Sequence, residues 1–342
     1  MGTPPPAGGA LSSKGPRFAN RPPGIACARA ATGIVTPTTG VLPRVVRWYL
    51  KSGLRGSTRC TVAAARRLKT LHAVPIVVNK RQRLWIDMRD GMSHLLLAGS
   101  PWTTVPWEFD EQVLMRRLVR AGDVAFDIGA HIGLHTVLLS DVVGPTGAVH
   151  AFEPNTGKAT PLARTVSTLP NATLHAFALG ETAGSGALFI PEDESMASLV
   201  DWTAGRAGDT RRASCHVKPL DDLIARGELP PPDFIKCDVE GGELAVMRGA
   251  HSALDQPHAP IVLYEANQEA ASGFGLSISA ATDFLRSLTR ANYSIFRAQA
   301  NALLTPIAEV AASDHPRVGD HFNLVAIPAS RLDRLTPTGT IS

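Results

Sequence analysis

Short runs of consecutive apolar residues alternate with segments of helical periodicity through most of the chain. Five runs are predicted to be buried strands: residues 124–129, 148–153, 172–179, 234–238 and 261–265. Four segments with helical spacing follow them: residues 132–143, 161–169, 244–254 and 278–290. This alternation is typical of a mostly parallel sheet with helices on both faces. A closing pair of strands is predicted at 293–297 and 321–327, with residues 298–320 as their connection.

An accessory segment over residues 43–120 precedes this pattern. Its apolar runs at 45–50 and 75–78 predict a helix and a strand, and residues 84–97 have the pattern of an extended hairpin. A helix is predicted over 108–119, where apolar residues recur at helical spacing. We place the main domain at residues 121–330 and expect 331–342 to be a C-terminal tail.

Composition separates the first 86 residues from the rest. They contain 15 Lys or Arg and no Asp or Glu, so the remaining residues carry 34 − 15 = 19 basic against 30 acidic side chains. An acid-free block is typical of a nucleic-acid arm, a membrane-surface segment or a targeting peptide. One third of residues 1–42 is Pro or Gly, which favours a disordered basic tail there.

The apolar content of 44% excludes disorder throughout the chain. No apolar stretch reaches the length of a membrane span, and the N-terminus lacks the order of a secretory signal. Four widely spaced cysteines fit a reducing compartment. We therefore expect a cytoplasmic protein, with mitochondrial import as a minor alternative. The sequence says nothing about the oligomeric state.

A glycine turn and an acidic strand end mark a ligand edge. Gly129 and Gly133 stand where the first strand gives way to a helix, the place where open α/β sheets bind nucleotide-like ligands. Their spacing differs from that of dinucleotide proteins, which makes NAD the weaker candidate. Glu153 ends the second strand, where a carboxylate can accept hydrogen bonds from two ribose hydroxyls. Alternatively, residues 153–155 only start a turn and cap the next helix.

Charged residues concentrate around the fourth strand, at 234–243. Lys236 and Asp238 share one face of that strand, and buried ions must be paired, so Lys236 is expected to reach Asp238 or Asp127. Glu265 ends the fifth strand. A crevice of carboxylates suits a cationic cofactor, a metal, or a reaction in which a hydroxyl loses its proton. No spacing of metal ligands stands out, so a divalent metal stays unassigned.

Several ordered motifs together carry a family resemblance. Residues 126–136 (Phe-Asp-Ile-Gly-Ala-His-Ile-Gly-Leu-His-Thr), 151–155, 178–180, 196–199 and 234–243 resemble those of FkbM-type S-adenosylmethionine-dependent methyltransferases. The resemblance covers roughly residues 91–328. It implies a class I methyltransferase fold, seven-stranded and Rossmann-like. It also implies O-methylation of a hydroxyl on a small molecule such as a sugar, a polyketide or another natural product.

The resemblance also implies roles for individual residues. The cofactor S-adenosylmethionine would be held by a set drawn from three strand ends: Asp127, Gly129, His131, Gly133, Glu153, Asn155 and Leu179. Asp238 would be the base that deprotonates or orients the acceptor hydroxyl, with Glu240 and Glu265 supporting it or binding the acceptor. His131 stands where the family usually has Asn. Residues 191–212 are expected to be either a lid over the acceptor or a plain surface loop.

Two other functions compete with this one. The first is a nucleic-acid methyltransferase or binder that grips phosphates with the basic N-terminal residues, although the main domain is acidic and would repel a polyanion. The second is a non-catalytic binder of an adenosine ligand. Binding that survives a substitution of Asp238, with turnover in neither form, would indicate the second.

Overall fold

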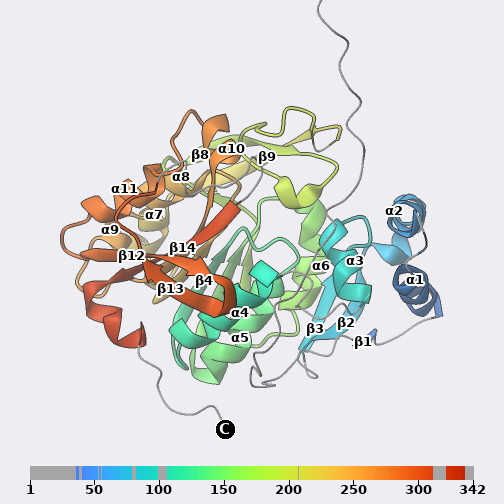
Figure 1. Cartoon of the computed structure of the whole chain (residues 1–342), viewed down its shortest axis with the longest axis horizontal. Coiled ribbons are helices and arrows are strands. Elements are labelled where there is room, and N and C mark those ends of the chain that lie inside the picture. Colours follow the sequence, from blue (N-terminus) through green and yellow to red (C-terminus); the bar gives the residue numbers. More distant parts are fainter. Residues whose placement is uncertain are drawn as a thin grey trace, which may run out of the picture. The chain divides into compact units, whose positions relative to one another are not determined.

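A single eight-stranded sheet forms the centre of the main domain (Figure 1). The computed structural model describes residues 36–37, 41–52, 54, 56–78, 82–98, 106–206, 208–310 and 321–335. In sheet order the strands are β6 (Ala172–His175), β5 (Ala148–Phe152), β4 (Val124–Ile128), β10 (Phe234–Cys237), β11 (Ile261–Asn267), β14 (His321–Pro328), β12 (Tyr293–Gln299) and β13 (Leu303–Pro306). The first five run parallel and the last three pair antiparallel. The predicted class I α/β fold is confirmed.

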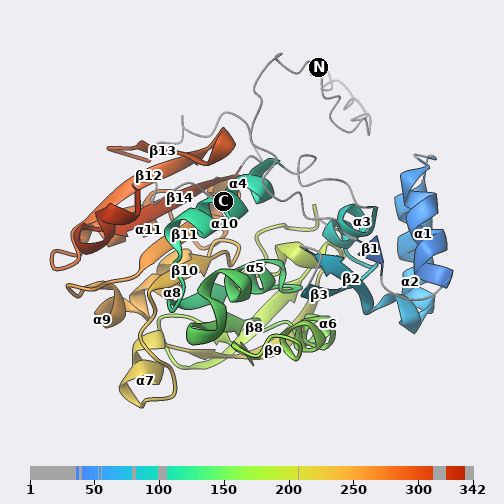
Figure 2. The same ribbon diagram turned by 90° about the horizontal axis from the view of Figure 1, so that it is seen from below.

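Helices cover both faces of this sheet because its strands alternate apolar side chains between two cores. On one face lie α4 (Pro106–Leu118) and α5 (Leu134–Val143), against which Ala125 packs. The other face carries α7 (Leu220–Ala225), α8 (Glu243–Arg248), α9 (His251–Leu254) and α11 (Ala280–Ser287). Phe126 and Ile128 face this second group. The view in Figure 2 shows α4 and α5 side by side. The carboxyl ends of β4, β5 and β10 therefore meet at one edge.

The structure corrects the third predicted strand. Residues 172–179 form two strands, because only β6 continues the central sheet while β7 (Ala178–Leu179) turns away from it. β7 joins a second sheet with β9 (Arg211–Lys218) and β8 (Gly184–Ile190). The sequence analysis missed β8 and β9. It also missed β13, which adds an eighth edge strand within the connection predicted over 298–320.

The accessory segment is a small layer beside the main sheet. It contains α1 (Val41–Lys51), α2 (Ser57–Arg67) and a three-stranded sheet of β1 (Thr36–Pro37), β2 (Val74–Val78) and β3 (Gln82–Ile86). The hairpin predicted over 84–97 is wrong, because β3 is followed by a helix, α3 (Gly91–Ala98). The pattern of this short apolar run is compatible with a strand or a helix. In the helix, Leu96 and Leu97 are buried in the core of the accessory layer.

The two predicted tails overlap folded residues. Residues 1–35 and 38–40 of the first tail lie outside the described residues, whereas β1 and the start of α1 fall within its predicted range. At the other end, residues 331–335 belong to a 3-10 helix, η7 (Ala329–Leu335). Arg334 in η7 is buried and pairs with Asp123. In the described part of the chain, no helix combines the length and apolarity needed to cross a bilayer.

Candidate active site

The turn after β4 is built around Gly129, which has a φ of 85°. Its N–H and that of Ala130 both donate to the carbonyl oxygen of Phe152, at 3.0 Å each, which joins the ends of β4 and β5. A Cβ at position 129 would lie 1.8 Å from the carbonyl oxygen of Asp238. Only glycine therefore allows β4 and β10 to end this close together.

Glu153, directly after β5, ties two loops together through its carboxylate. Oε2 accepts a hydrogen bond from the backbone N–H of His131 at 2.9 Å, and Oε1 accepts one from the N–H of Asn155 at 2.7 Å. The residue is buried, yet it lines a pocket. A carboxylate oxygen has more than one acceptor site, so Glu153 can also accept from ligand hydroxyls.

This pocket lies at the carboxyl ends of the parallel strands and, with the open solvent at its mouth included, has a volume of about 740 Å³. Six predicted residues line it: Gly129, His131, Glu153, Leu179, Asp238 and Glu240. The structure adds apolar lining residues that sequence reasoning missed: Phe177, Leu188 and Phe274. Phe177 stood inside the strand misassigned over 172–179. The sequence carried no signal for Phe274, which comes from a distant helix end.

Four predicted site residues lie outside this pocket. Asp127 is fully buried, and its Oδ2 accepts from the hydroxyl of Thr136 in α5 at 2.6 Å. At Gly133 (φ 86°), a Cβ would lie 2.7 Å from Leu162 in α6 (Thr156–Val166), so this glycine serves helix packing. Asn155 caps α6 by accepting from the N–H of Gly157 at 3.0 Å. Glu265 lines a smaller neighbouring pocket of about 310 Å³.

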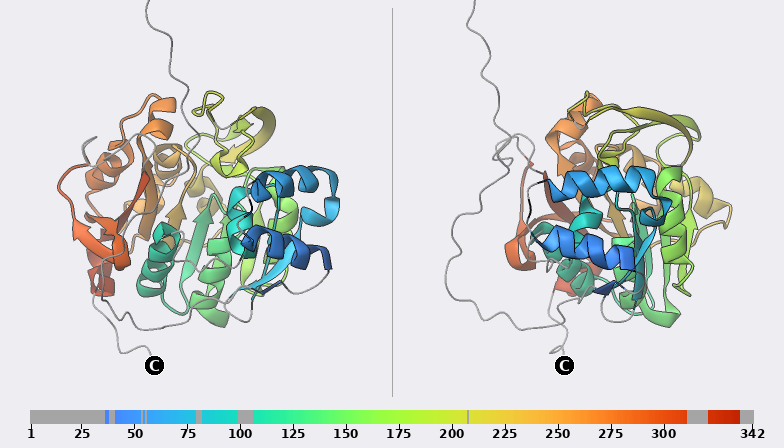
Figure 3. Two further views of the ribbon diagram at one scale, coloured as in Figure 1. Left: turned by 45° about the vertical axis from the view of Figure 1, so that its right-hand side comes forward. Right: turned by 90° about the vertical axis from the view of Figure 1, so that its right-hand side faces the viewer.

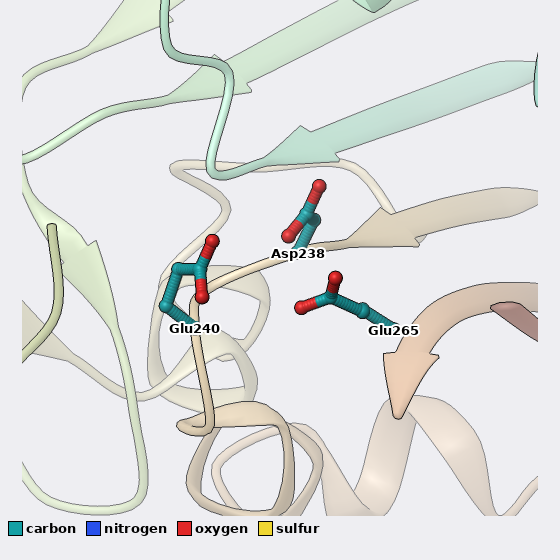
Figure 4. A group of neighbouring side chains, drawn as sticks. All are labelled: Asp238, Glu240 and Glu265. Carbon is teal, nitrogen blue, oxygen red and sulfur yellow. The ribbon is translucent and has the colours of Figure 1, made fainter. Parts of the chain in front are cut away.

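Three carboxylates converge at the pocket, two from the turn after β10 and one from β11 (Figure 4). One oxygen from each of Asp238, Glu240 and Glu265 lies within 4.8 Å of the others. Lys236 Nζ lies 2.9 Å from Asp238 Oδ2, which confirms the predicted ion pair. Oxygens at this spacing are compatible with a shared divalent cation. They serve a cationic cofactor or a proton transfer equally well, and we assign no metal to them.

Burial and mutual repulsion set the protonation of this group. Burial, followed by the charges of Asp238 and Glu243, raises the pKa of Glu240 well above its usual range. Burial, followed by the charges of Glu240 and Asp238, does the same to the pKa of Glu265. For Lys236, burial lowers the pKa, but the negative charges of Asp238, Asp127 and Glu111 outweigh burial. The pKa of Lys236 therefore lies above its usual range. Burial and the neighbouring negative charges therefore both favour the protonated forms of Glu240 and Glu265.

The turn between β10 and α8 has an unusual backbone that points Glu240 into the pocket. Glu240 itself has a φ of 56°, and Gly241 follows with a φ of 97°. Glu243, at the start of α8, holds this turn because its Oε1 accepts from the N–H groups of Val239 and Gly241, each at 3.2 Å. Burial raises the pKa of Glu243 to about 7.

We expect Glu243→Gln to change how stability depends on pH. The pKa of Glu243 is about 7 when folded against 4.5 ordinarily, so its contribution to stability is complete below pH 4.5 and lost as pH rises through 7. Glutamine keeps an acceptor oxygen and does not titrate. The free energy of unfolding of the variant, measured relative to that of wild type, should therefore rise by up to about 3 kcal/mol between pH 4.5 and pH 8. Denaturant titrations at several pH values measure it.

Glu309→Gln provides the control for this experiment. The side chain of Glu309 is exposed, so its stability difference from wild type should stay constant over the same pH range. A Glu243→Gln difference that is equally flat would contradict the raised pKa.

Part of the 191–212 segment lines the pocket. Ser195, Ser198 and Leu199 line it, and Ser198 Oγ donates to the carbonyl oxygen of Glu240 at 2.8 Å. Ser198 also exchanges two backbone hydrogen bonds with Phe189 of β8. Residues between 194 and 199 thus contribute to the wall of the pocket.

The accessory layer touches the glycine turn through His131. Its Nε2 lies 3.2 Å from Oδ2 of Asp90, a buried residue between β3 and α3. His131 has a φ of 52°, and its backbone N–H is held by Glu153. His135, the second histidine of this motif, lies instead 3.5 Å from Glu111 of α4 and does not line the pocket. His216 on β9 does not line it either.

Part of this chain is similar to known methyltransferases. Residues 127–295 match the model of the methyltransferase FkbM domain. The chain is also 30% identical over 157 residues to hexuronic acid methyltransferase AglP of Haloferax volcanii, covering 44% of this chain and 61% of that protein. The chain thus spans less than two thirds of this relative.

Solved structures with some likeness are also methyltransferases. Precorrin-6y C5,15-methyltransferase of Geobacter metallireducens has 12% identity and a TM-score of 0.35, covering 64% of this chain and 88% of that one. An O-methyltransferase of Thermotoga maritima has 13% identity and a TM-score of 0.35, with 64% of each chain covered. Because these TM-scores are below 0.5, the fold described above rests on the strand order of this chain and not on these structures. The match over residues 127–295 confirms that this part of the chain resembles the FkbM methyltransferase domain.

Proposed function

We propose that this protein transfers a methyl group from S-adenosylmethionine to a hydroxyl of a small molecule, with a sugar as the leading acceptor class. One observation supports this most: the Gly129 turn, Glu153 and Asp238 come from three different strand ends and line one pocket. The relative from Haloferax volcanii is a hexuronic acid methyltransferase, which favours a sugar as the acceptor.

The pocket residues fit the three parts of this cofactor. Glu153 would accept hydrogen bonds from the ribose hydroxyls, and the apolar Leu179 and Phe177 would border the adenine ring. The carboxylates of Asp238 and Glu240 would face the positive sulfur. When bound, S-adenosylmethionine supplies a methyl group activated by that charge. The spacing of Gly129 and Gly133 differs from that of the glycine loop that binds the pyrophosphate of NAD, so NAD fits this turn less well.

The protein's own part in the reaction is positioning and proton removal. Asp238 would accept the proton of the acceptor hydroxyl, since its carboxylate lines the pocket at the end of β10. Lys236 holds that carboxylate in place from within the sheet. The 191–212 segment closes one side against water, and Glu240 and Glu265 would contact the acceptor.

Calorimetric titration with S-adenosylmethionine, with its demethylated product and with NAD is the direct test of the cofactor. We expect the first two to bind and NAD not to bind. Product release from labelled S-adenosylmethionine, screened over neutral sugars and uronic acids, then tests the acceptor class. Absence of binding by both adenosyl ligands would overturn the proposal.

Glu153→Ala should weaken binding of S-adenosylmethionine and its product by about 10- to 100-fold. Each lost hydrogen bond to a charged group costs about 1.5–3 kcal/mol. The same titration measures the loss. Glu181→Ala is the matched control, because Glu181 follows β7 near the same edge but is exposed and pairs with Arg248. An unchanged affinity in Glu153→Ala would remove Glu153 from the ribose site.

A further inference from the structure

The outer face of α1 combines exposed apolar and basic side chains. Val41, Val45 and Trp48 stand at helical spacing and are 79%, 53% and 68% exposed, while Val46 on the opposite side is buried. Arg44 and Lys51, both exposed, flank this stripe. We call Val41, Arg44, Val45, Trp48 and Lys51 the α1 face. The side of a surface helix that faces solvent is normally polar, whereas the α1 face exposes three apolar side chains.

The neighbouring helix extends the positive charge of the α1 face. α2 lies beside α1, and both run across one side of the accessory layer, as the right-hand view of Figure 3 shows. Four exposed basic residues, Arg59, Arg66, Arg67 and Lys69, lie on or just after α2, and Arg66 pairs with Glu192 of the main domain. Residues 41–86 contain no Asp or Glu to offset them. A docked partner must therefore carry negative charge and accept apolar side chains together.

We propose that the α1 face docks this protein on an anionic lipid bilayer. Val41, Val45 and Trp48 enter the headgroup region, and Arg44 and Lys51 pair with lipid phosphates. Helices that lie in the membrane interface have this composition, with apolar and aromatic residues on one face and Lys or Arg at its borders. Tryptophan in particular prefers the level of the headgroups.

Other occupants fit the α1 face less well. A second copy of the chain would bring two positive surfaces together. A nucleic acid would pair with the basic side chains, but its phosphates would not bury the three apolar ones. Stacking of bases needs several aromatic side chains, and the α1 face has one that is exposed, Trp48. The proposal is independent of methyl transfer and is tested by lipid binding alone.

Co-sedimentation of the full chain with vesicles tests the proposal. We expect binding to vesicles that contain phosphatidylglycerol, at least about tenfold tighter than to pure phosphatidylcholine, and weaker binding in high salt. Arg44→Gln with Lys51→Gln should lose about 25-fold in affinity, at about fivefold per charge. Val45→Ser with Trp48→Ser should lose about tenfold or more.

Matched controls lie at the far end of the main domain. Arg290→Gln removes an exposed charge and Leu303→Ser an exposed apolar side chain, and both should leave vesicle binding unchanged. The substituted side chains are all exposed, so melting temperatures should stay near that of wild type. Failure of wild type to bind anionic vesicles would overturn the proposal. The proposal would also be overturned, in favour of a nucleic-acid surface, if vesicle binding were unchanged by Val45→Ser with Trp48→Ser and were abolished by a duplex oligonucleotide.

Discussion

Replacing Asp238 with asparagine is expected to lower methyl transfer by at least about 100-fold while S-adenosylmethionine still binds. Asparagine has the same shape but cannot take up a proton, and removal of a general base costs about 10²- to 10⁴-fold. Asp238 lines the pocket with a side chain that is 38% exposed, so an acceptor can reach it. Single-turnover rates with an acceptor found by screening, and calorimetry for the cofactor, measure the two effects separately.

The buried partner of Asp238 complicates this variant and supplies its control. Lys236 is only 4% exposed, and loss of its nearest carboxylate leaves a buried charge that destabilises the fold. The double variant Lys236→Met/Asp238→Asn removes both charges and should recover stability without recovering turnover. Asp222→Asn on α7 is an exposed control that should keep wild-type rates.

Two results would contradict the assignment of Asp238. Near-normal turnover in Asp238→Asn would mean that another group takes the proton. Cofactor binding in both proteins with turnover in neither, across the whole acceptor panel, would indicate a non-catalytic adenosine binder.

Gly129→Val is expected to abolish cofactor binding and to destabilise the protein by at least about 2 kcal/mol. A residue with a Cβ is strained at a φ of 85°, at a cost of about 1–2 kcal/mol, and a β-branched side chain fits there worse. The larger effect is steric, since the new Cβ would meet the carbonyl oxygen of Asp238 at 1.8 Å. The ends of β4 and β10 must then separate, which displaces Asp238. Denaturant unfolding and calorimetry measure both losses.

Gly56→Val separates strain from collision. Gly56 has nearly the same φ, 84°, but none of the described residues comes within 4 Å of the place that a Cβ would take there. It should show a modest loss of stability and normal cofactor binding. If Gly129→Val behaves no differently from Gly56→Val, the contact between the two strand ends does not hold the site together.

Local patterns in the sequence determined much of the central sheet and part of the site. The strands β4, β5, β10 and β11 are short, mostly apolar runs bounded by turn residues, and such runs have few alternatives when helices alternate with them. Because parallel strands end at one edge, Gly129, Glu153 and Asp238 could be predicted to lie near each other. Their presence in one pocket follows from connectivity that is readable along the chain.

Only the tertiary structure decided the features that depend on distant partners. β7, β8 and β9 form a separate sheet through pairings between residues 178 and 218, and no local periodicity announces them. Side chains alternate between sheet faces, so Ile128 at the end of β4 lines the pocket while the carboxylate of its neighbour Asp127 turns to Thr136 of α5 on the other face. Glu265 meets Asp238 and Glu240 because β11 pairs in register with β10. Exposure of Val45 and Trp48 likewise follows from which side of α1 the accessory core covers, and an amphipathic pattern alone leaves that choice open.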